Sequence, residues 1–179
     1  MFIRCLVIFQ LNLLAIGCSG NSKELNPNHI LLHAEAGYFK EKIEPVETEG
    51  YKKLTLNLHD LKNGTNWAPG IMITFYKGNY DNSLIFHLIQ KEETDKYLTP
   101  GYRYALNGND IFITDLDYKH DIGKPIDFEV RWDKNGVFQF SFGNIKPIRF
   151  KPEFRADKLV YSVSSGNGEI IIHDKSANK

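Results

Sequence analysis

Cysteine is nearly absent from this 179-residue sequence, since Cys5 and Cys18 are the only two. Both lie close to the N-terminus, so the remainder of the chain has no pair of thiols that could form a disulfide. A domain built from that remainder must therefore be held together by its hydrophobic core. The length is sufficient for one domain with a sizeable core and is short for two.

An excess of charge of either sign is also lacking. The 22 Lys and Arg residues balance the 22 Asp and Glu residues, so the formal net charge is zero. A neutral domain gains no long-range attraction to a polyanion, and we therefore expect no nucleic acid partner. The hydrophobic fraction of 42% and the charged fraction of 25% are typical of a folded globular protein.

Long apolar runs and helical periodicity are missing as well. The mostly apolar run 6–16 is too short for a membrane span, which needs about 20 residues. No stretch beyond it keeps an apolar period of 3.6 residues over ten positions. Aromatic residues, by contrast, make up 13% of the chain, and such side chains favour strands.

The N-terminus carries an export signal. Arg4 precedes the apolar run, which ends in Ala15-Ile16-Gly17-Cys18, and this tetrapeptide resembles the lipobox of bacterial lipoproteins. The resemblance implies that residues 1–17 are a signal peptide and that Cys18 carries the lipid, including palmitate. Residues 18–28 then form a polar tether to the membrane. Ser19 favours the outer membrane of the cell envelope as the location. The alternative is an ordinary secretory signal, which would leave Cys18 as a lone exposed thiol.

Strand-like runs follow one another every 8–14 residues, separated by Gly, Asn, Asp and Pro. This rhythm predicts an all-β domain over 29–179, a two-sheet antiparallel β-sandwich. We expect the first strand to pair with the last, and runs 70–76 and 83–90, apolar on both faces, to be central and covered on both sides. The predicted strands cover residues 29–39, 53–59, 70–76, 83–90, 102–106, 110–116, 126–132, 137–142, 145–150, 159–163 and 169–173.

Turn signals separate several of these runs. Asn107-Gly108-Asn109 and Lys134-Asn135-Gly136 predict tight hairpins, and 164–168 predicts a loop between the last two strands. The alternation around the second hairpin predicts that four side chains are buried between the sheets. These are Val130, Trp132, Phe138 and Phe140.

The stretches 127–144 and 159–173 resemble the C-terminal strands of concanavalin A-like lectin/glucanase and laminin G-like jelly rolls. In those domains a strand ending in Trp turns at Asn-Gly or Asp-Gly and returns toward a Gly-Asn bend, as Trp132, Asn135-Gly136 and Gly143-Asn144 do here. The resemblance implies a jelly roll that faces carbohydrate. The fold hosts lectins, glucanases and lyases, so it does not fix the function.

Candidate catalytic residues are few. Asp127 and Glu129 lie two apart on one strand face, a spacing compatible with glycoside hydrolysis. The Glu-x-Asp-x-x-Glu pattern of the fold's glucanases is missing, as are the Arg-x-Glu-x-Arg and Gln-x-His pieces of its alginate lyases. The competing interpretation is a solvated charge ladder that includes Arg131. The sequence has no Gly-x-Ser-x-Gly elbow and no dinucleotide fingerprint.

Metal-binding patterns are also weak. Asp115, Asp117 and Asp121 form an acidic run that is a candidate for Ca²⁺, although it lacks the glycine and closing Glu of an EF-hand loop. His33-Ala34-Glu35 and His59-Asp60 each lack a third convergent ligand for zinc. We therefore expect no cofactor other than this calcium candidate.

Aromatic side chains near loops offer the best candidate binding site. Trp67, Tyr76, Tyr80 and Asp81 combine rings that can stack on sugar C–H faces with a carboxylate that can bind hydroxyl groups. The alternative is that these rings only cap the sandwich, or that Trp67 and Tyr80 belong to separate sites. The leading prediction is a non-catalytic lectin-like domain that binds glycan or a protein partner. Alternatives are a polysaccharide-degrading enzyme and a structural scaffold of the envelope.

Overall fold

A computed structural model describes residues 28–62 and 67–173, which contain strands and no helix. No helix in these ranges is therefore available to cross a membrane. The predicted signal peptide, Cys18 and nearly all of the tether lie outside the described residues. The strands are β1 (His29–Pro45), β2 (Gly50–His59), β3 (Gly70–Lys77), β4 (Asn79–Ile89), β5 (Tyr97–Leu106), β6 (Asn109–Asp115), β7 (His120–Asp121), β8 (Ile126–Trp132), β9 (Phe138–Phe142), β10 (Ile148–Phe150) and β11 (Lys158–His173).

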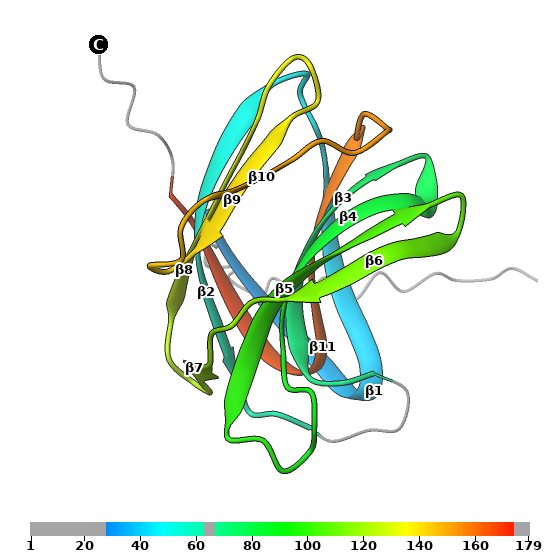
Figure 1. The fold of residues 1–179 in the computed structure, drawn as a ribbon. Coiled ribbons are helices and arrows are strands. Elements are labelled where there is room, and N and C mark those ends of the chain that lie inside the picture. Colours follow the sequence, from blue (N-terminus) through cyan, green and yellow to red (C-terminus); the bar gives the residue numbers. More distant parts are fainter. Residues whose placement is uncertain (1–27, 63–66, 174–179) are drawn as a thin grey trace, which may run out of the picture.

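All pairings are antiparallel, and the strands form two layers that face each other, as Figure 1 shows. The first sheet runs β6-β5-β4-β3 and continues into the first half of β11 and the second half of β1. The second sheet runs β10-β9-β8-β2 and continues into the other halves of the same two strands. The predicted β-sandwich of the jelly-roll type is confirmed.

The two long strands, β1 and β11, pass from one sheet to the other. The predicted pairing of the first strand with the last is confirmed, with His29 opposite Ile171 and Pro45 opposite Lys158. The predicted loop at 164–168 is wrong, because β11 continues through it. Ser164, Asn167 and Gly168 are paired with strands on both sides, and Gly166 is paired with β1. The bend is local: Ser165 has a φ of 46°, and the register of β1 shifts between Ala34 and Phe39.

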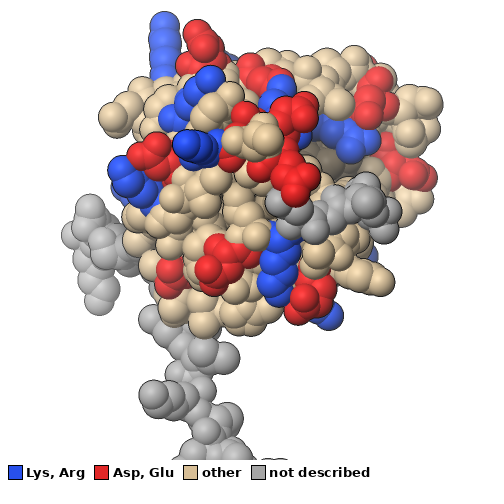
Figure 2. Space-filling view, turned by 90° about the horizontal axis from the view of Figure 1, so that it is seen from below, with Lys and Arg blue, Asp and Glu red and all other residues tan. Residues whose placement is uncertain are grey.

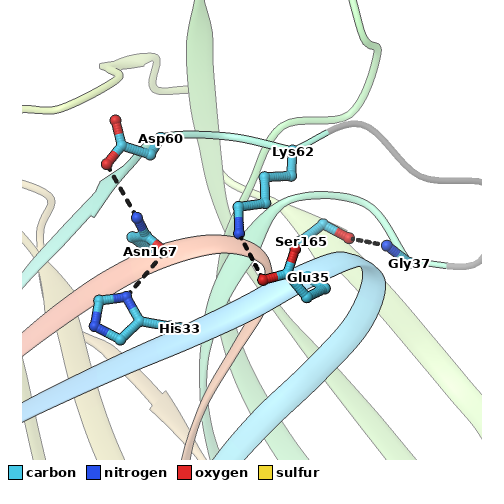
Figure 3. Close-up of polar contacts among 7 residues, drawn as sticks. All are labelled: His33, Glu35, Gly37, Asp60, Lys62, Ser165 and Asn167. Atoms are coloured by element: carbon cyan, nitrogen blue, oxygen red, sulfur yellow. Dashed lines mark hydrogen bonds and ion pairs between the residues drawn. The ribbon is translucent and has the colours of Figure 1, made fainter.

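Side chains at the bend hold the two strands in place. The Ser165 hydroxyl accepts a hydrogen bond of 3.0 Å from the backbone N–H of Gly37, as Figure 3 shows. On the neighbouring strands, the Asn167 amide donates to Asp60 at 3.0 Å, and its oxygen lies 3.0 Å from Nδ1 of His33. The polar side chains of residues 164–168 thus form hydrogen bonds at a bend within the sheet, and this segment does not leave the sheet.

The core lies between the sheets and is rich in phenylalanine. Val130, Trp132, Phe138 and Phe140 are 0%, 8%, 2% and 1% exposed, so the predicted burial and strand register are confirmed. The indole N–H of Trp132 donates to the carbonyl of Glu47 at 2.8 Å, which satisfies its one polar atom. Facing rings interlock in the centre, for example Phe140 with rings of the first sheet at centroid distances of 4.5 and 5.0 Å.

The predicted hairpin at Asn107-Gly108 is also confirmed. Leu106 pairs with Asn109, so the turn contains only two residues, and both have positive φ, 52° and 77°. This conformation suits the right-handed twist of the flanking strands and favours Asn followed by Gly. The second predicted hairpin joins β8 to β9, where the Asp133 carboxylate accepts the backbone N–H groups of Asn135 and Val137.

Candidate ligand-binding face

The outer face of the first sheet carries most of the predicted site residues. Successive strand residues point to opposite faces, so the neighbours of each core residue point outward. We use the term ring-bearing face for this surface together with the two aromatic side chains that border it. Its residues are Phe39, Glu41, Trp67, Met72, Thr74, Tyr76, Tyr80, His87, Gly101, Arg103, Asp115, Ser162 and Ser164.

Trp67 borders this face at the start of β3. Its ring meets Phe39 of β1 edge to face, with a centroid distance of 5.7 Å and an angle of 66°, and the side chain remains 48% exposed. Two buried hydroxyl groups hold its main chain: Ser165 donates to the Trp67 carbonyl and Ser164 to the Ala68 carbonyl, both at 2.6 Å. The ring is thus positioned by β11 and yet open to a ligand.

Tyr80 borders the same face at the other end of β3. Its ring stacks on Tyr76 at a centroid distance of 4.5 Å, and its hydroxyl donates to Glu41 at 2.7 Å. Burial, reinforced by the Glu41 carboxylate, raises the pKa of Tyr80 well above its usual value, so the hydroxyl remains a donor. Tyr80 is 46% exposed, but Tyr76 is only 4% exposed. The expectation that Tyr76 contacts ligand needs correction, because Tyr76 supports the ring of Tyr80 instead.

The two exposed rings belong to one surface. Trp67 contacts Phe39, and Tyr80 contacts Glu41, two positions further along the same face of β1. Residues so spaced lie about 6–7 Å apart on a strand. Both rings thus border one face, and their binding of one common ligand stays a prediction. Short buried side chains from the neighbouring strands, such as Ser162 and Thr74, lie beside them.

Further polar groups continue this face across β4, β5 and β6. His87 is 6% exposed and packs over Gly101, where an added Cβ would lie 2.3 Å from its Nε2 atom. Only glycine leaves room for this imidazole. Burial lowers the pKa of His87 to about 4, partly opposed by Asp115 at 3.7 Å. Asp115 also binds Lys91, and Arg103 binds Asp110. At neutral pH, therefore, the face presents an uncharged imidazole beside paired charges.

Asp81 lies at the end of this sheet rather than between the rings. Its carboxylate accepts the side-chain amide of Asn79 at 2.6 Å, and its carbonyl accepts the N–H of Gly108 at 3.0 Å. It therefore joins the β3–β4 turn to the β5–β6 turn. Its predicted contact with a ligand stays a prediction.

The acidic run proposed for calcium does not gather. Asp115 binds Lys91, and Asp121 binds Lys124 at 2.7 Å. The hydrogen bond and the positive charge of Lys124 lower the pKa of Asp121. Within 28–62 and 67–173, no three His, Cys, Asp or Glu side chains are arranged to hold a metal ion. This statement covers His33-Ala34-Glu35 and His59-Asp60, which therefore belong to no such cluster.

The alternative catalytic pair lies on the outer face of the second sheet. Lys53 reaches both carboxylates, at 3.2 Å from Glu129 and 4.0 Å from Asp127. Thr55 donates to Asp127 at 2.9 Å. Both acidic side chains are about half exposed, at 54% for Asp127 and 43% for Glu129. This arrangement matches the charge ladder that the alternation also allowed.

Sequence reasoning missed the residues that position the two rings. Phe39 and Glu41 were overlooked because Lys40 and Lys42 alternate with them, so the second half of β1 had no clear apolar side. Ser164 and Ser165 were assigned to a loop. The alternation Phe39, Glu41, Ile43 against Lys40, Lys42, Glu44 was the available signal for a strand at an edge.

Comparison with known proteins identifies the fold and no family. No protein-family profile matches this sequence, and neither does any curated protein sequence. The carbohydrate recognition domain of Emp47p superposes with a TM-score of 0.55, at 9% identity over 85% of this chain and 89% of that chain. Galectin LEC-6 of Caenorhabditis elegans superposes with a TM-score of 0.53, at 12% identity over 82% of this chain and 96% of that chain. The β-glucanase of Bacillus licheniformis superposes with a TM-score of 0.53, at 8% identity over 82% of this chain and 78% of that chain. Both carbohydrate binders and an enzyme thus share this lectin-like jelly roll.

Proposed function

We propose that this chain is a lipid-anchored protein of the bacterial cell envelope whose jelly-roll domain binds a glycan on the ring-bearing face and does not cleave it. The observation that carries the proposal is the pair of half-exposed rings, Trp67 and Tyr80, fixed on one face of one sheet. Sugars bind such rings through their C–H faces, and nearby polar groups bind their hydroxyls.

Most charged groups of the ring-bearing face are paired, while the Glu41 carboxylate beside the rings accepts the Tyr80 hydroxyl and forms no ion pair among the described residues. His87 is uncharged at neutral pH, and Asp115 and Arg103 already have counter-ions. Acidic and basic side chains are also intermixed on the face of the molecule that Figure 2 shows. A surface of this kind offers hydrogen bonds rather than a strong field. The similar fold of the Emp47p carbohydrate recognition domain and of galectin LEC-6 adds support.

Binding is favoured over hydrolysis by the position of Lys53. Glycoside hydrolysis needs one carboxylic acid and one carboxylate flanking the scissile bond. Here the ammonium group of Lys53 lies within 4.0 Å of both Asp127 and Glu129, and both side chains are open to water. The pair is also on the sheet opposite to the exposed rings. An enzyme remains the alternative because the β-glucanase has a similar fold.

Glycan binding is tested with the full chain, purified in detergent, on a glycan array. We expect Trp67→Ala and Tyr80→Ala each to weaken binding by about 1–2 kcal/mol, because each removes one stacking ring without opening the core. Tyr118→Ala is the matched control, since Tyr118 is another exposed ring, at 37%. An array without any binding would favour a protein-binding scaffold, and turnover abolished by Glu129→Gln would favour an enzyme.

The lipid anchor rests on the lipobox-like sequence around Cys18. Residues 19–28 can span at most about 35 Å when fully extended, so the anchor would hold the domain close to the membrane. Three acyl chains, each methylene contributing about 0.8 kcal/mol, would make release from the membrane negligible. Mass spectrometry of the native protein should detect the acylated Cys18, and Cys18→Ser should yield an unprocessed or soluble form. A mature N-terminus at another residue would exclude the anchor.

A further inference from the structure

An open groove lies at the outer face of the second sheet, away from the ring-bearing face. Its volume is about 740 Å³, within the range of small-molecule sites. Four of its lining residues form one continuous row across four strands. These are Tyr51 of β2, Arg131 of β8, Gln139 of β9 and Arg149 of β10, each paired with the next. We refer to this surface as the arginine groove.

The register fixes how the two guanidinium groups are placed. Neighbouring strands lie about 4.8 Å apart, so the Cα atoms of Arg131 and Arg149 are separated by about 10 Å, with Gln139 between them. The Nε atom of Arg131 donates to the Gln139 side-chain oxygen at 3.1 Å. Gln139 is neutral, so this contact orients Arg131 and leaves its charge uncompensated.

Neither arginine forms an ion pair with a carboxylate anywhere in the described part of the chain. The lining acid Asp133 is occupied by the β8–β9 turn, where it accepts two backbone N–H groups at 2.8 and 3.0 Å. Glu49, the other lining acid, is exposed at the rim. Lys52 also lines the groove but is paired with Glu44 at 2.7 Å. The groove therefore holds two guanidinium groups that form no ion pair within 4.0 Å among the described residues. The backbone N–H of Val137 and the charges of Arg149 and Lys151 lower the pKa of Asp133, so this carboxylate offsets part of the Arg149 charge.

We propose that the arginine groove binds the oxyanion of an acidic sugar, a carboxylate or a sulfate ester, between Arg131 and Arg149. A guanidinium group matches two oxygens of such an anion with parallel hydrogen bonds. Tyr51 forms a wall of the groove and offers a ring beside which the sugar can lie. An acidic saccharide fits better than nucleic acid, because the whole chain has zero net charge and the groove offers one local pair of arginines.

The site is independent of the proposed function, since the two surfaces belong to different sheets. The experiment measures binding of tetragalacturonate and of its methyl ester to the full chain by calorimetry. A sulfated galactan tetrasaccharide and its desulfated form make up the second arm. For whichever of the two anions the groove recognises, carboxylate or sulfate ester, we expect the charged ligand to bind at least about tenfold more tightly than its neutral form. Added salt should weaken the binding of the charged ligand.

Variants assign the effect to the groove. Arg131→Gln and Arg149→Gln should each weaken binding of the charged ligand at least about tenfold, and Arg131→Lys should restore only part of it because the fork geometry is lost. Both arginines are exposed, so the variants should unfold at the temperature of the parent chain. Lys96→Gln, which removes one exposed charge far along the chain, is the control and should bind normally.

Three outcomes would overturn the inference. They are binding of neither charged ligand, equal binding of charged and neutral forms, and unchanged binding by both arginine variants. Trp67→Ala should not alter binding of the acidic ligand. If it abolished that binding, the acid would sit on the ring-bearing face, and the arginine groove would be excluded while glycan binding by the domain stood.

Discussion

Replacing Ser165 with Ala should reveal how the exposed ring of Trp67 is held in place. The Ser165 hydroxyl is 0% exposed, accepts the N–H of Gly37 at 3.0 Å and donates to the carbonyl of Trp67 at 2.6 Å. Ser165→Ala leaves both backbone groups without this partner. Each buried group that loses its partner costs about 1–3 kcal/mol, so we expect a loss of about 2–6 kcal/mol in the free energy of unfolding.

The neighbouring residue supplies a matched control. The Ser164 hydroxyl, 2% exposed, donates one hydrogen bond of the same length, 2.6 Å, to the Ala68 carbonyl. Ser164→Ala should therefore cost about half as much, roughly 1–3 kcal/mol. Backbone strain does not confuse the comparison at Ser165, because Ser and Ala have similar difficulty with its positive φ of 46°. Urea unfolding with the slope unchanged measures both values.

A spectroscopic measurement links the stability change to the site. Trp67 is 48% exposed and Trp132 is 8% exposed, so acrylamide quenches chiefly the fluorescence of Trp67. In Ser165→Ala the main chain at Trp67 should loosen, and the ring of Trp67 should lose its contact with Phe39. Quenching of the Trp67 fluorescence should therefore increase, while Trp132 stays protected. If Ser165→Ala costs no more than Ser164→Ala and leaves the quenching unchanged, then the double hydrogen bond does not position the ring.

Two other predictions follow from burial. Phe140→Ala should lower the free energy of unfolding by about 3–5 kcal/mol, because the ring is 1% exposed between the sheets; a loss below 1 kcal/mol in urea would contradict that packing. For His87, the folded pKa of about 4 lies below the unfolded value near 6.5, so the unfolded state takes up the proton first as pH falls. The free energy of unfolding should then decrease by about 3 kcal/mol as the pH falls from 6.5 to 4. His87→Gln should remove this part of the pH dependence. An unchanged pH dependence in the variant would show that His87 is not buried in its uncharged form.

The strand alternation and turn residues of this chain were sufficient to predict the sandwich. Phe138 and Phe140 separated by Gln139, after a turn at Asn135-Gly136, fixed both the faces and the register. Local pattern could not predict the bend of β11, because Ser165 and its polar neighbours have the composition of a loop. Strand pairing on both sides of Ser164 and Asn167 and the hydrogen bonds of the Ser165 hydroxyl hold this segment in the sheet.

The candidate site was predicted in part for a related reason. Trp67 and Tyr80 were identified from their ring type and loop position. The common face of these two rings depends on Phe39 and Glu41. Both are distant in sequence from Trp67 and Tyr80, and the pairing of β1 with β11 brings them close. The arginine groove was also not predicted. Arg149 lies on β10, a strand of three residues, whereas the sequence pattern predicted a strand over 145–150 and did not show that Arg149 faces Gln139. Arg131 was assigned to a compensated ladder, whereas its partner is the neutral Gln139.

The pairing of β1 with β11 also determines when this protein can finish folding. His29 and Glu169 meet at 2.6 Å although 140 positions separate them, and β11 contributes a strand to each sheet. Neither sheet is complete until the last strand has emerged from the ribosome, and contacts of such long range form slowly. The export that we propose would gain from this delay, because a chain without a stable sandwich is easier to translocate. By the same logic, a truncation within β11 would deprive both sheets of a central strand and should leave an unfolded chain rather than a smaller domain.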